Sequence, residues 1–230
     1  IASDHRQGAP RGEIERNSGD GAAALLVAND TVIAQWEGSH SITENMLDSW
    51  RSAGDPFVRS WEDRFATEEG LERLVGEAVH GFFQKQGIAP ADAAKVALYA
   101  PDARRHAQLA QKLGFHAEQV QDPLFGRLGN TGAAFPLMLL TQALAEASPD
   151  QLLMLVSYGD GSDVLAFRAT PLTGRLPQKG LGLKGHLESK RVLESYELYA
   201  RWRGVWPTDD AARRPTPASP SVTALWREEE

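Results

Sequence analysis

The segment L-G-N-T-G-A-A-F-P, residues 128–136, places two glycines around an Asn-Thr pair and then continues into an apolar run. Apolar spacing after the Asn-Thr pair predicts a helix over 132–147, and two β-rich runs predict strands over 152–157 and 164–169. The two strands are separated by Y-G-D-G-S-D, whose glycines suit a tight hairpin turn. The segment therefore leads into a helix that is followed by a strand hairpin.

The residues before this segment show a similar alternation. The run K-V-A-L-Y-A, residues 95–100, predicts a short strand, and a helix is predicted over 101–113. Apolar residues three and four apart predict an amphipathic helix over 67–86, with a capped acidic start at Thr67. Strands and helices in this order predict an α/β layered fold.

The N-terminal region has weaker patterns. Residues 22–28 and 32–38 are predicted as two strands of a hairpin, because the turn residues Asn and Asp lie between them. A short helical pattern covers 44–50.

The character of the sequence changes after residue 172. A glycine-rich loop is expected up to residue 185, a helix over 186–202 and an extended Pro-rich arm over 207–230. The predicted organisation is a domain over 1–172, a linker and helix over 173–206, and the arm.

Composition limits the classes of function. The chain has 230 residues, 42% of them hydrophobic, and a net charge of −7 with Lys and Arg scattered among acids, so we expect no nucleic-acid partner. It has no cysteine, and its apolar runs are shorter than the roughly 18 residues of a membrane span. We expect a cytoplasmic protein without membrane contact. The first residue is Ile, which suggests a fragment, a split protein or a processed product.

Metal binding is not predicted. The six histidines, at 5, 40, 80, 106, 116 and 186, show no H-x-x-x-H or E-x-x-H pairing.

Asn130 is the first candidate site residue. An Asn before a helix can satisfy backbone N–H groups as a cap, or it can present its amide to an oxygen that becomes negative during a reaction. Both interpretations remain open on spacing alone, since G-N-T-G is a short and common pattern.

Several segments, in the same order, resemble the C-terminal half of bacterial and archaeal hydroxymethylglutaryl-CoA synthase and, more distantly, ketoacyl synthase III, both of the thiolase superfamily. They are S-D-H-R (3–6), G-D-G-A-A-A-L-L (19–26), D-S-W-R-S-A-G-D-P-F-V-R-S-W-E-D-R-F (48–65), K-L-G-F (112–115), G-N-T-G-A-A (129–134) and V-S-Y-G-D-G (156–161). The long Trp-containing segment is the most specific of these. The resemblance implies the second half of a five-layered αβαβα fold, with a helical and extended C-terminal tail.

The resemblance also implies site residues. In such enzymes a Cys in the first half takes an acyl group from CoA, and a His and an Asn in the second half assist a Claisen-type condensation. The Asn corresponds to Asn130, whereas Tyr99 stands where the His is expected. Substrate-binding backbone is implied at the four glycines of the two glycine motifs, which are Gly129, Gly132, Gly159 and Gly161.

Tyr99 changes the chemistry that we expect. A phenol with a pKa near 10 is mainly a proton donor, so Tyr99 suits a developing alkoxide or enolate in an aldol-type reaction. The alternatives are an inactive site and an ordinary buried tyrosine.

Two classes of function follow from the resemblance. In the first, the chain contributes the Asn side of an acyl-CoA-handling site whose Cys lies in a missing half or a partner subunit. In the second, it is a non-catalytic partner that scaffolds an active acyltransferase or an OB-fold zinc-ribbon module. A CoA thioester is the expected substrate, no bound cofactor is expected, and the protein is expected to be a homo- or hetero-oligomer. Aromatic residues near the C-terminus, among them Tyr196 and Trp206, suit either a partner surface or packing within the chain.

Overall fold

The computed structural model describes residues 1–173 and 182–206. It divides into two compact units, residues 1–190 and 191–230, and each is described by itself. The predicted arm over 207–230 and much of the predicted glycine-rich loop lie outside the described residues. The three-part organisation of the chain stays a prediction.

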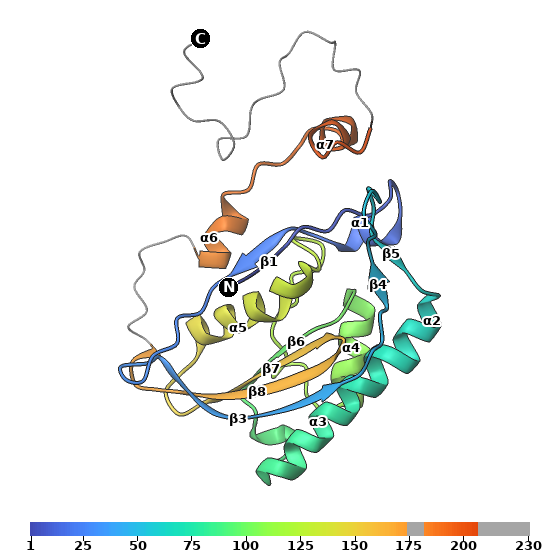
Figure 1. Ribbon diagram of the computed structural model, residues 1–230. Coiled ribbons are helices and arrows are strands. Elements are labelled where there is room, and N and C mark those ends of the chain that lie inside the picture. Colours follow the sequence, from blue (N-terminus) through green and yellow to red (C-terminus); the bar gives the residue numbers. More distant parts are fainter. Residues whose placement is uncertain (174–181, 207–230) are drawn as a thin grey trace, which may run out of the picture. The chain divides into compact units, whose positions relative to one another are not determined.

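The first unit is built on a four-stranded sheet with the order β3-β8-β7-β6 (Figure 1). Its strands are β3 (Ala34–Thr43), β6 (Lys95–Leu98), β7 (Leu152–Gly159) and β8 (Gly161–Ala169). β6 is parallel to β7, whereas β8 is antiparallel to both β7 and β3. The predicted hairpin after residue 152 is confirmed, and residues 152–156 of its first strand, β7, are buried on both faces of the sheet.

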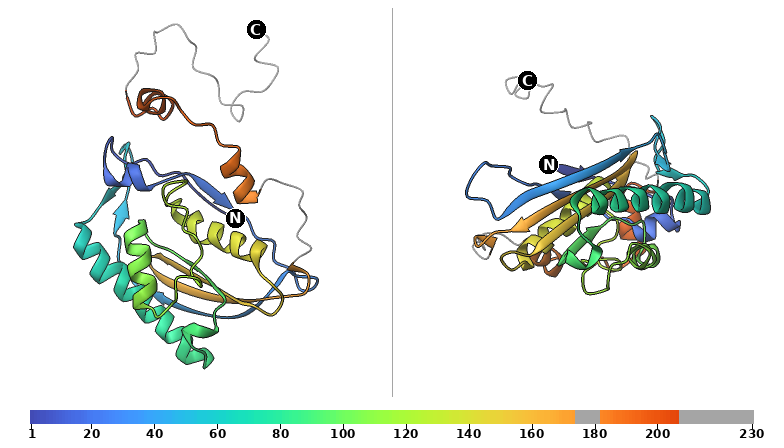
Figure 2. Two further views of the ribbon diagram at one scale, coloured as in Figure 1. Left: turned by 180° about the vertical axis from the view of Figure 1, so that it is seen from behind. Right: turned by 90° about the horizontal axis from the view of Figure 1, so that it is seen from below.

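Helices cover this sheet on both sides (Figures 1 and 2). α3 (Arg73–Gln86) packs on β3 and β8, and α5 (Phe135–Glu146) packs on β6 and β7. α4 (Ala103–Lys112) lies beside α3, and an ion pair of 2.5 Å joins Lys112 to Glu72 at the start of α3. These layers confirm the α/β fold and the predicted helices that precede and follow residue 128.

A second, smaller sheet lies on the far side of α5. It consists of β1 (Ala2–Asp4) and β2 (Gly21–Ala23) in antiparallel pairing. α5 contacts β2 as well as β6 and β7, so this helix lies between two sheets. Its apolar residues are accordingly buried around most of its circumference.

Short elements complete the first unit. They are α1 (Glu13–Asn17), β4 (Ser49–Trp50), β5 (Arg59–Ser60), α2 (Asp63–Phe65), a π-helix (Ala66–Glu72), two 3₁₀ turns (Pro90–Asp92 and Gly132–Ala134) and α6 (Gly182–Glu188). β4 pairs with β5 as a small separate ladder. Among the described residues, no helix has the length and apolar character needed to span a membrane.

The predicted hairpin over 22–28 and 32–38 is wrong. β2 stops at Ala23 and pairs with β1, whereas the second run belongs to β3 and pairs with β8. Residues 24–31 form no strand, and Leu26 and Val27 are 96% and 90% exposed. Residues 24–28 therefore have β-propensity but no partner strand in the described part of this chain.

Two predicted helix features are also wrong. Residues 44–50 are not helical, because Ser49 and Trp50 pair with Ser60 and Arg59 in the small ladder. The helix predicted from Thr67 begins earlier, since the Glu62 carboxylate accepts hydrogen bonds from the backbone N–H groups at the start of α2.

The helix predicted over 186–202 is two helices. α6 ends at Glu188, and α7 (Tyr196–Trp202), in the second unit, has its own cap. The Ser195 hydroxyl accepts a hydrogen bond of 3.3 Å from the Leu198 N–H. Tyr196 packs against Trp206 with ring centres 6.3 Å apart, so part of the aromatic terminus contacts itself.

Candidate functional site

A cavity of about 190 Å³ lies at the C-terminal end of β6. Tyr99 and Asn130 both line it, although 31 positions separate them in the chain. The structure thus brings together the two residues that sequence analysis selected as catalytic. Their roles remain predictions.

Asn130 is fixed by its backbone and by its side chain. Its N–H donates to the Asn17 carbonyl at 2.7 Å, and its carbonyl accepts from the Gly19 N–H at 2.9 Å. Its side-chain Oδ1 accepts from the Gly132 N–H at 2.8 Å, which is the local capping role. Its Nδ2 donates to the Tyr99 hydroxyl at 3.2 Å and to the Ala100 carbonyl at 3.3 Å. The amide therefore caps the turn and holds Tyr99 at the same time.

Tyr99 follows β6 directly and is 8% exposed. Its ring packs edge-on against Phe135 with centres 6.1 Å apart, and its hydroxyl also hydrogen-bonds the guanidinium of Arg6. Asp4 holds that guanidinium through a contact of 3.1 Å between its Oδ2 and the Arg6 Nε. Since Asn130 and Arg6 both donate to the Tyr99 oxygen, its own proton is left for a third acceptor.

The environment keeps Arg6 charged. Burial alone lowers the pKa of Arg6, but its contacts with Tyr99 and Asp4 together outweigh burial and raise this pKa. A fixed positive charge therefore lies beside the Tyr99 hydroxyl. Such a charge favours any negative oxygen that forms nearby.

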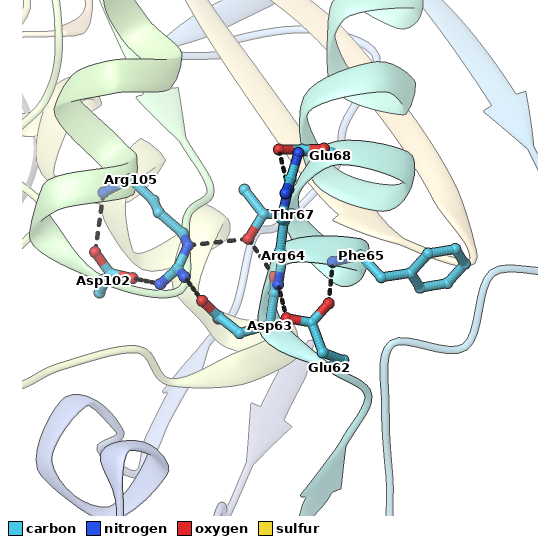
Figure 3. Close-up of polar contacts among 8 residues, drawn as sticks. All are labelled: Glu62, Asp63, Arg64, Phe65, Thr67, Glu68, Asp102 and Arg105. Carbon is cyan, nitrogen blue, oxygen red and sulfur yellow. Dashed lines mark hydrogen bonds and ion pairs between the residues drawn. The ribbon is translucent and has the colours of Figure 1, made fainter.

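Arg105 joins two helical segments at one wall of the cavity (Figure 3). It comes from the first turn of α4, where Asp102 caps the helix by accepting from the Arg105 N–H at 2.9 Å. Its guanidinium pairs with the carboxylates of Asp102 and Asp63, and its Nε donates to the Thr67 hydroxyl at 3.0 Å. These contacts fix the start of the 63–72 helical segment against α4.

Tyr158 forms another part of the wall, and its ring centre is 5.8 Å from that of Tyr99. Burial is the main cause that raises the pKa of Tyr158, and the neighbouring Asp48 carboxylate raises it further. The Tyr158 phenol therefore stays protonated across the physiological range.

The four predicted substrate-binding glycines have different positions. Gly129 has φ +92°, and a Cβ there would meet the Asn17 carbonyl; Gly132 has φ +60°, and a Cβ there would meet the Asp4–Arg6 pair. Both positions exclude a side chain because the chain itself packs there. Gly159 and Gly161 face each other across the β7–β8 turn and do not line the cavity. Their role as substrate contacts stays a prediction.

Most polar residues of this cavity were not selected from the sequence, among them Arg6, Tyr158 and Arg105. Arg6 and Tyr158 lie within the segments S-D-H-R and V-S-Y-G-D-G, so the signal was present in motifs already quoted. Arg105 carries no motif, since two of its partners, Asp63 and Thr67, come from a segment far away in the chain. Within the described ranges, no three His, Cys, Asp or Glu side chains are grouped as metal ligands would be.

Comparison with known proteins gives the family context of this arrangement. The family model described as 3-oxoacyl-[acyl-carrier-protein (ACP)] synthase III C terminal matches residues 83–167. Hydroxymethylglutaryl-CoA synthase of Methanopyrus kandleri is 31% identical over 206 residues, which is 88% of this chain and 58% of that protein. The enzyme of Methanocaldococcus jannaschii is 30% identical, again over 88% of this chain and 59% of that protein. The chain is hydroxymethylglutaryl-CoA synthase-like and ketoacyl synthase III-like.

The hydroxymethylglutaryl-CoA synthase-like chain thus spans less than two thirds of the length of these curated relatives. Solved structures agree on its fold. A crystal structure titled HMG_CoA synthase complexed with CoA superposes with a TM-score of 0.70 and 18% identity, over 87% of this chain and 55% of that one. 3-Oxoacyl-[acyl-carrier-protein] synthase III from Aquifex aeolicus superposes with a TM-score of 0.53 and 18% identity, over 61% and 46%. The fold of this chain is therefore thiolase-like.

Proposed function

We propose that this hydroxymethylglutaryl-CoA synthase-like chain supplies one side of an acyl-CoA-handling acyltransferase site that forms carbon–carbon bonds. The observation that carries the proposal is the contact of Asn130 and Arg6 with the Tyr99 hydroxyl at the edge of a cavity. The chain has no cysteine, so the nucleophile that accepts the acyl group comes from another half or a partner subunit.

The chemistry of this side is proton and hydrogen-bond donation. Claisen and aldol steps place negative charge on a carbonyl oxygen as the new bond forms. The Tyr99 hydroxyl donates its proton toward that oxygen, Asn130 orients the hydroxyl, and the Arg6 charge favours the developing anion. Asn130 thus acts through Tyr99, since both of its Nδ2 contacts are to atoms of this chain.

Two further observations support the proposal. A structural neighbour of the same fold was crystallised with CoA, which fits a CoA thioester as the substrate. The apolar residues Leu26 and Val27 follow β2 in the chain and are exposed, which fits coverage by a second polypeptide or half.

A non-catalytic scaffold is the second candidate function. It is favoured by Tyr99 at the position where the resemblance places a His, together with the absence of cysteine. In that case the Tyr99–Asn130 pair is a structural contact, and any activity belongs wholly to the partner.

Turnover of the complete assembly tests both candidates. Tyr99→Phe and Asn130→Ala are compared with Asn45→Ala, an exposed Asn that does not line the cavity. We expect each site variant to lower kcat at least about tenfold with acetyl-CoA and a short acyl acceptor, and the control to leave kcat unchanged. Unchanged turnover in both site variants would remove this pair from the mechanism and favour the scaffold.

A further inference from the structure

One wall of the Tyr99 cavity is the helical segment 63–72, which we call the helical wall. Most of it is a π-helix, Ala66–Glu72. A π-helix is a wide helix with hydrogen bonds between residues five apart, and it occurs rarely but frequently at functional sites. Gly70, within this π-helix, is buried. The residues of the helical wall that line the cavity are Asp63, Ala66, Thr67 and Leu71.

Gly70 lies directly against the Tyr158 side chain. A Cβ at Gly70 would overlap the Tyr158 hydroxyl oxygen and would lie 3.4 Å from its Cζ. That oxygen is buried, whereas the ring lines the cavity, with its centre 5.8 Å from that of the Tyr99 ring. Because residue 70 has no side chain, the Tyr158 hydroxyl can occupy this place beside the helix.

The helical wall is fixed on both sides of Gly70. The Arg105 Nε donates to the Thr67 hydroxyl at 3.0 Å (Figure 3). Leu71 is 3% exposed and belongs to the main hydrophobic core. A side chain added at Gly70 would therefore displace the Tyr158 ring and not the helix. Displacement away from the helix moves this ring toward the cavity that it lines.

We propose that Gly70 is a specificity-determining residue of the site, because it leaves room for Tyr158 at the helical wall and thereby sets the space for an acyl group beside Tyr99. This inference rests on the proposed acyltransferase function. The cavity, of about 190 Å³, is smaller than most small-molecule sites, so the position of one ring decides what fits. Movement of the ring toward Tyr99 should exclude an acyl group, whereas loss of the ring should admit a longer one.

NMR of the full chain with ¹³C-labelled tyrosine tests the contact without any turnover. Gly70→Ala should shift the ring resonances of Tyr158 and Tyr99, because the position of one ring affects the shifts of the other. Gly76→Ala is the matched control in the helix that follows, since a Cβ there meets nothing within 4 Å. It should leave both resonances unchanged.

A double variant tests whether the overlap with the hydroxyl is the cause. Tyr158→Phe removes the oxygen that a Cβ at Gly70 would meet. The Tyr99 resonance of Gly70→Ala/Tyr158→Phe should therefore match that of Tyr158→Phe alone. Equal shifts in the Gly70→Ala and Gly76→Ala proteins, or no recovery in the double variant, would overturn the proposal.

Kinetics of the complete assembly test the specificity itself. Gly70→Ala should raise KM for acetyl-CoA at least about tenfold while kcat changes less, because a narrower cavity weakens binding. Tyr158→Ala should raise kcat/KM for hexanoyl-CoA relative to acetyl-CoA at least about tenfold, because the longer acyl chain then has room. Gly76→Ala should change neither quantity.

The two measurements separate this inference from the proposed function. An unchanged KM in Gly70→Ala and an unchanged substrate ratio in Tyr158→Ala, in an assembly that turns over, would overturn the role of Gly70 and leave the proposed function standing. An assembly that does not turn over even with the unaltered chain would contradict the proposed function and the specificity role with it.

Discussion

At the end of β6, the Tyr99 hydroxyl accepts hydrogen bonds from the Asn130 amide and the Arg6 guanidinium. Two donors on one oxygen polarise the phenol and direct its remaining proton away from both of them. An imidazole at this position would be able to accept a proton near neutral pH, whereas the phenol mainly donates. Because Tyr99 stands where the resemblance places a His, we expect this residue to act by donating a proton.

Tyr99→Phe should destabilise the chain as well as lower activity. Removal of the hydroxyl leaves the buried Asn130 Nδ2 with one partner fewer, which costs about 1–3 kcal/mol in the free energy of unfolding. Tyr158→Phe is the matched change in the same cavity and should cost less, because its neighbour Asp48 is partly exposed and can hydrogen-bond water instead, whereas Asn130 is buried. Urea unfolding measures the free energy of unfolding of both variants. Equal losses would show that the Tyr99 hydroxyl stabilises the chain no more than the Tyr158 hydroxyl does.

His106 should make the stability depend on pH. Burial lowers its folded-state pKa to about 4 from an ordinary value of 6.5, so the unfolded chain binds the proton more readily between these values. The free energy of unfolding should therefore fall as pH drops from 6.5 through 4, by about 3 kcal/mol from this residue. His106→Gln should reduce that pH dependence in urea titrations, and His80→Gln, at an exposed position, should not. The same slope in wild type and His106→Gln would contradict the buried neutral imidazole.

Among the elements, those with strong local signals were predictable. The helices after residues 67, 101 and 132 and the β7–β8 hairpin follow from apolar spacing and from turn residues, both of which are local properties. The first predicted hairpin was wrong because strand partners are chosen by tertiary contacts. The break between α6 and α7 had a local signal, the Ser195 cap, that the continuous apolar pattern concealed.

The site was predictable only in part, for a related reason. Asn130 and Tyr99 lie in short motifs, whereas Arg105 is recognisable only after folding, when Asp63 and Thr67 come beside it. Residue patterns locate groups that are near in sequence, and long-range ion pairs have no such pattern.

The β7–β8 turn offers a test at the level of an element. Gly161 has φ +124°, and a Cβ there would meet the Ile42 carbonyl, whereas a Cβ at Gly159 meets nothing within 4 Å. Gly161→Ala should therefore destabilise the chain by about 1–3 kcal/mol. Gly159→Ala should stay within about 0.5 kcal/mol of wild type. Thermal or urea unfolding measures the difference, and similar values for both would contradict the geometry of this turn.

For the whole molecule, the exposed apolar run after β2 is the feature that most requires a partner. α5 lies between two sheets, and the smaller sheet has only two strands. Leu26 and Val27 would continue β2 if another strand were added beside it. The proposed function therefore predicts that the Cys-bearing half or subunit contacts this sheet.

Leu26→Asp should separate assembly from folding. Because Leu26 is 96% exposed, the change should alter the free energy of unfolding of this chain by no more than about 0.5 kcal/mol. It should weaken association with the Cys-bearing partner at least about tenfold, since a charge at a buried apolar interface is unfavourable. Analytical ultracentrifugation measures association, and unchanged association would move the partner away from β2.

In the proposed function, this chain completes an acyl-CoA site whose cysteine lies on another polypeptide or half. The most direct measurement is the intact mass of the natural protein, with whatever co-purifies, after incubation with acetyl-CoA. We expect the added mass of one acetyl group on a cysteine-containing piece and none on this chain. A stable assembly in which no piece is acylated would contradict the claim and support the scaffold function.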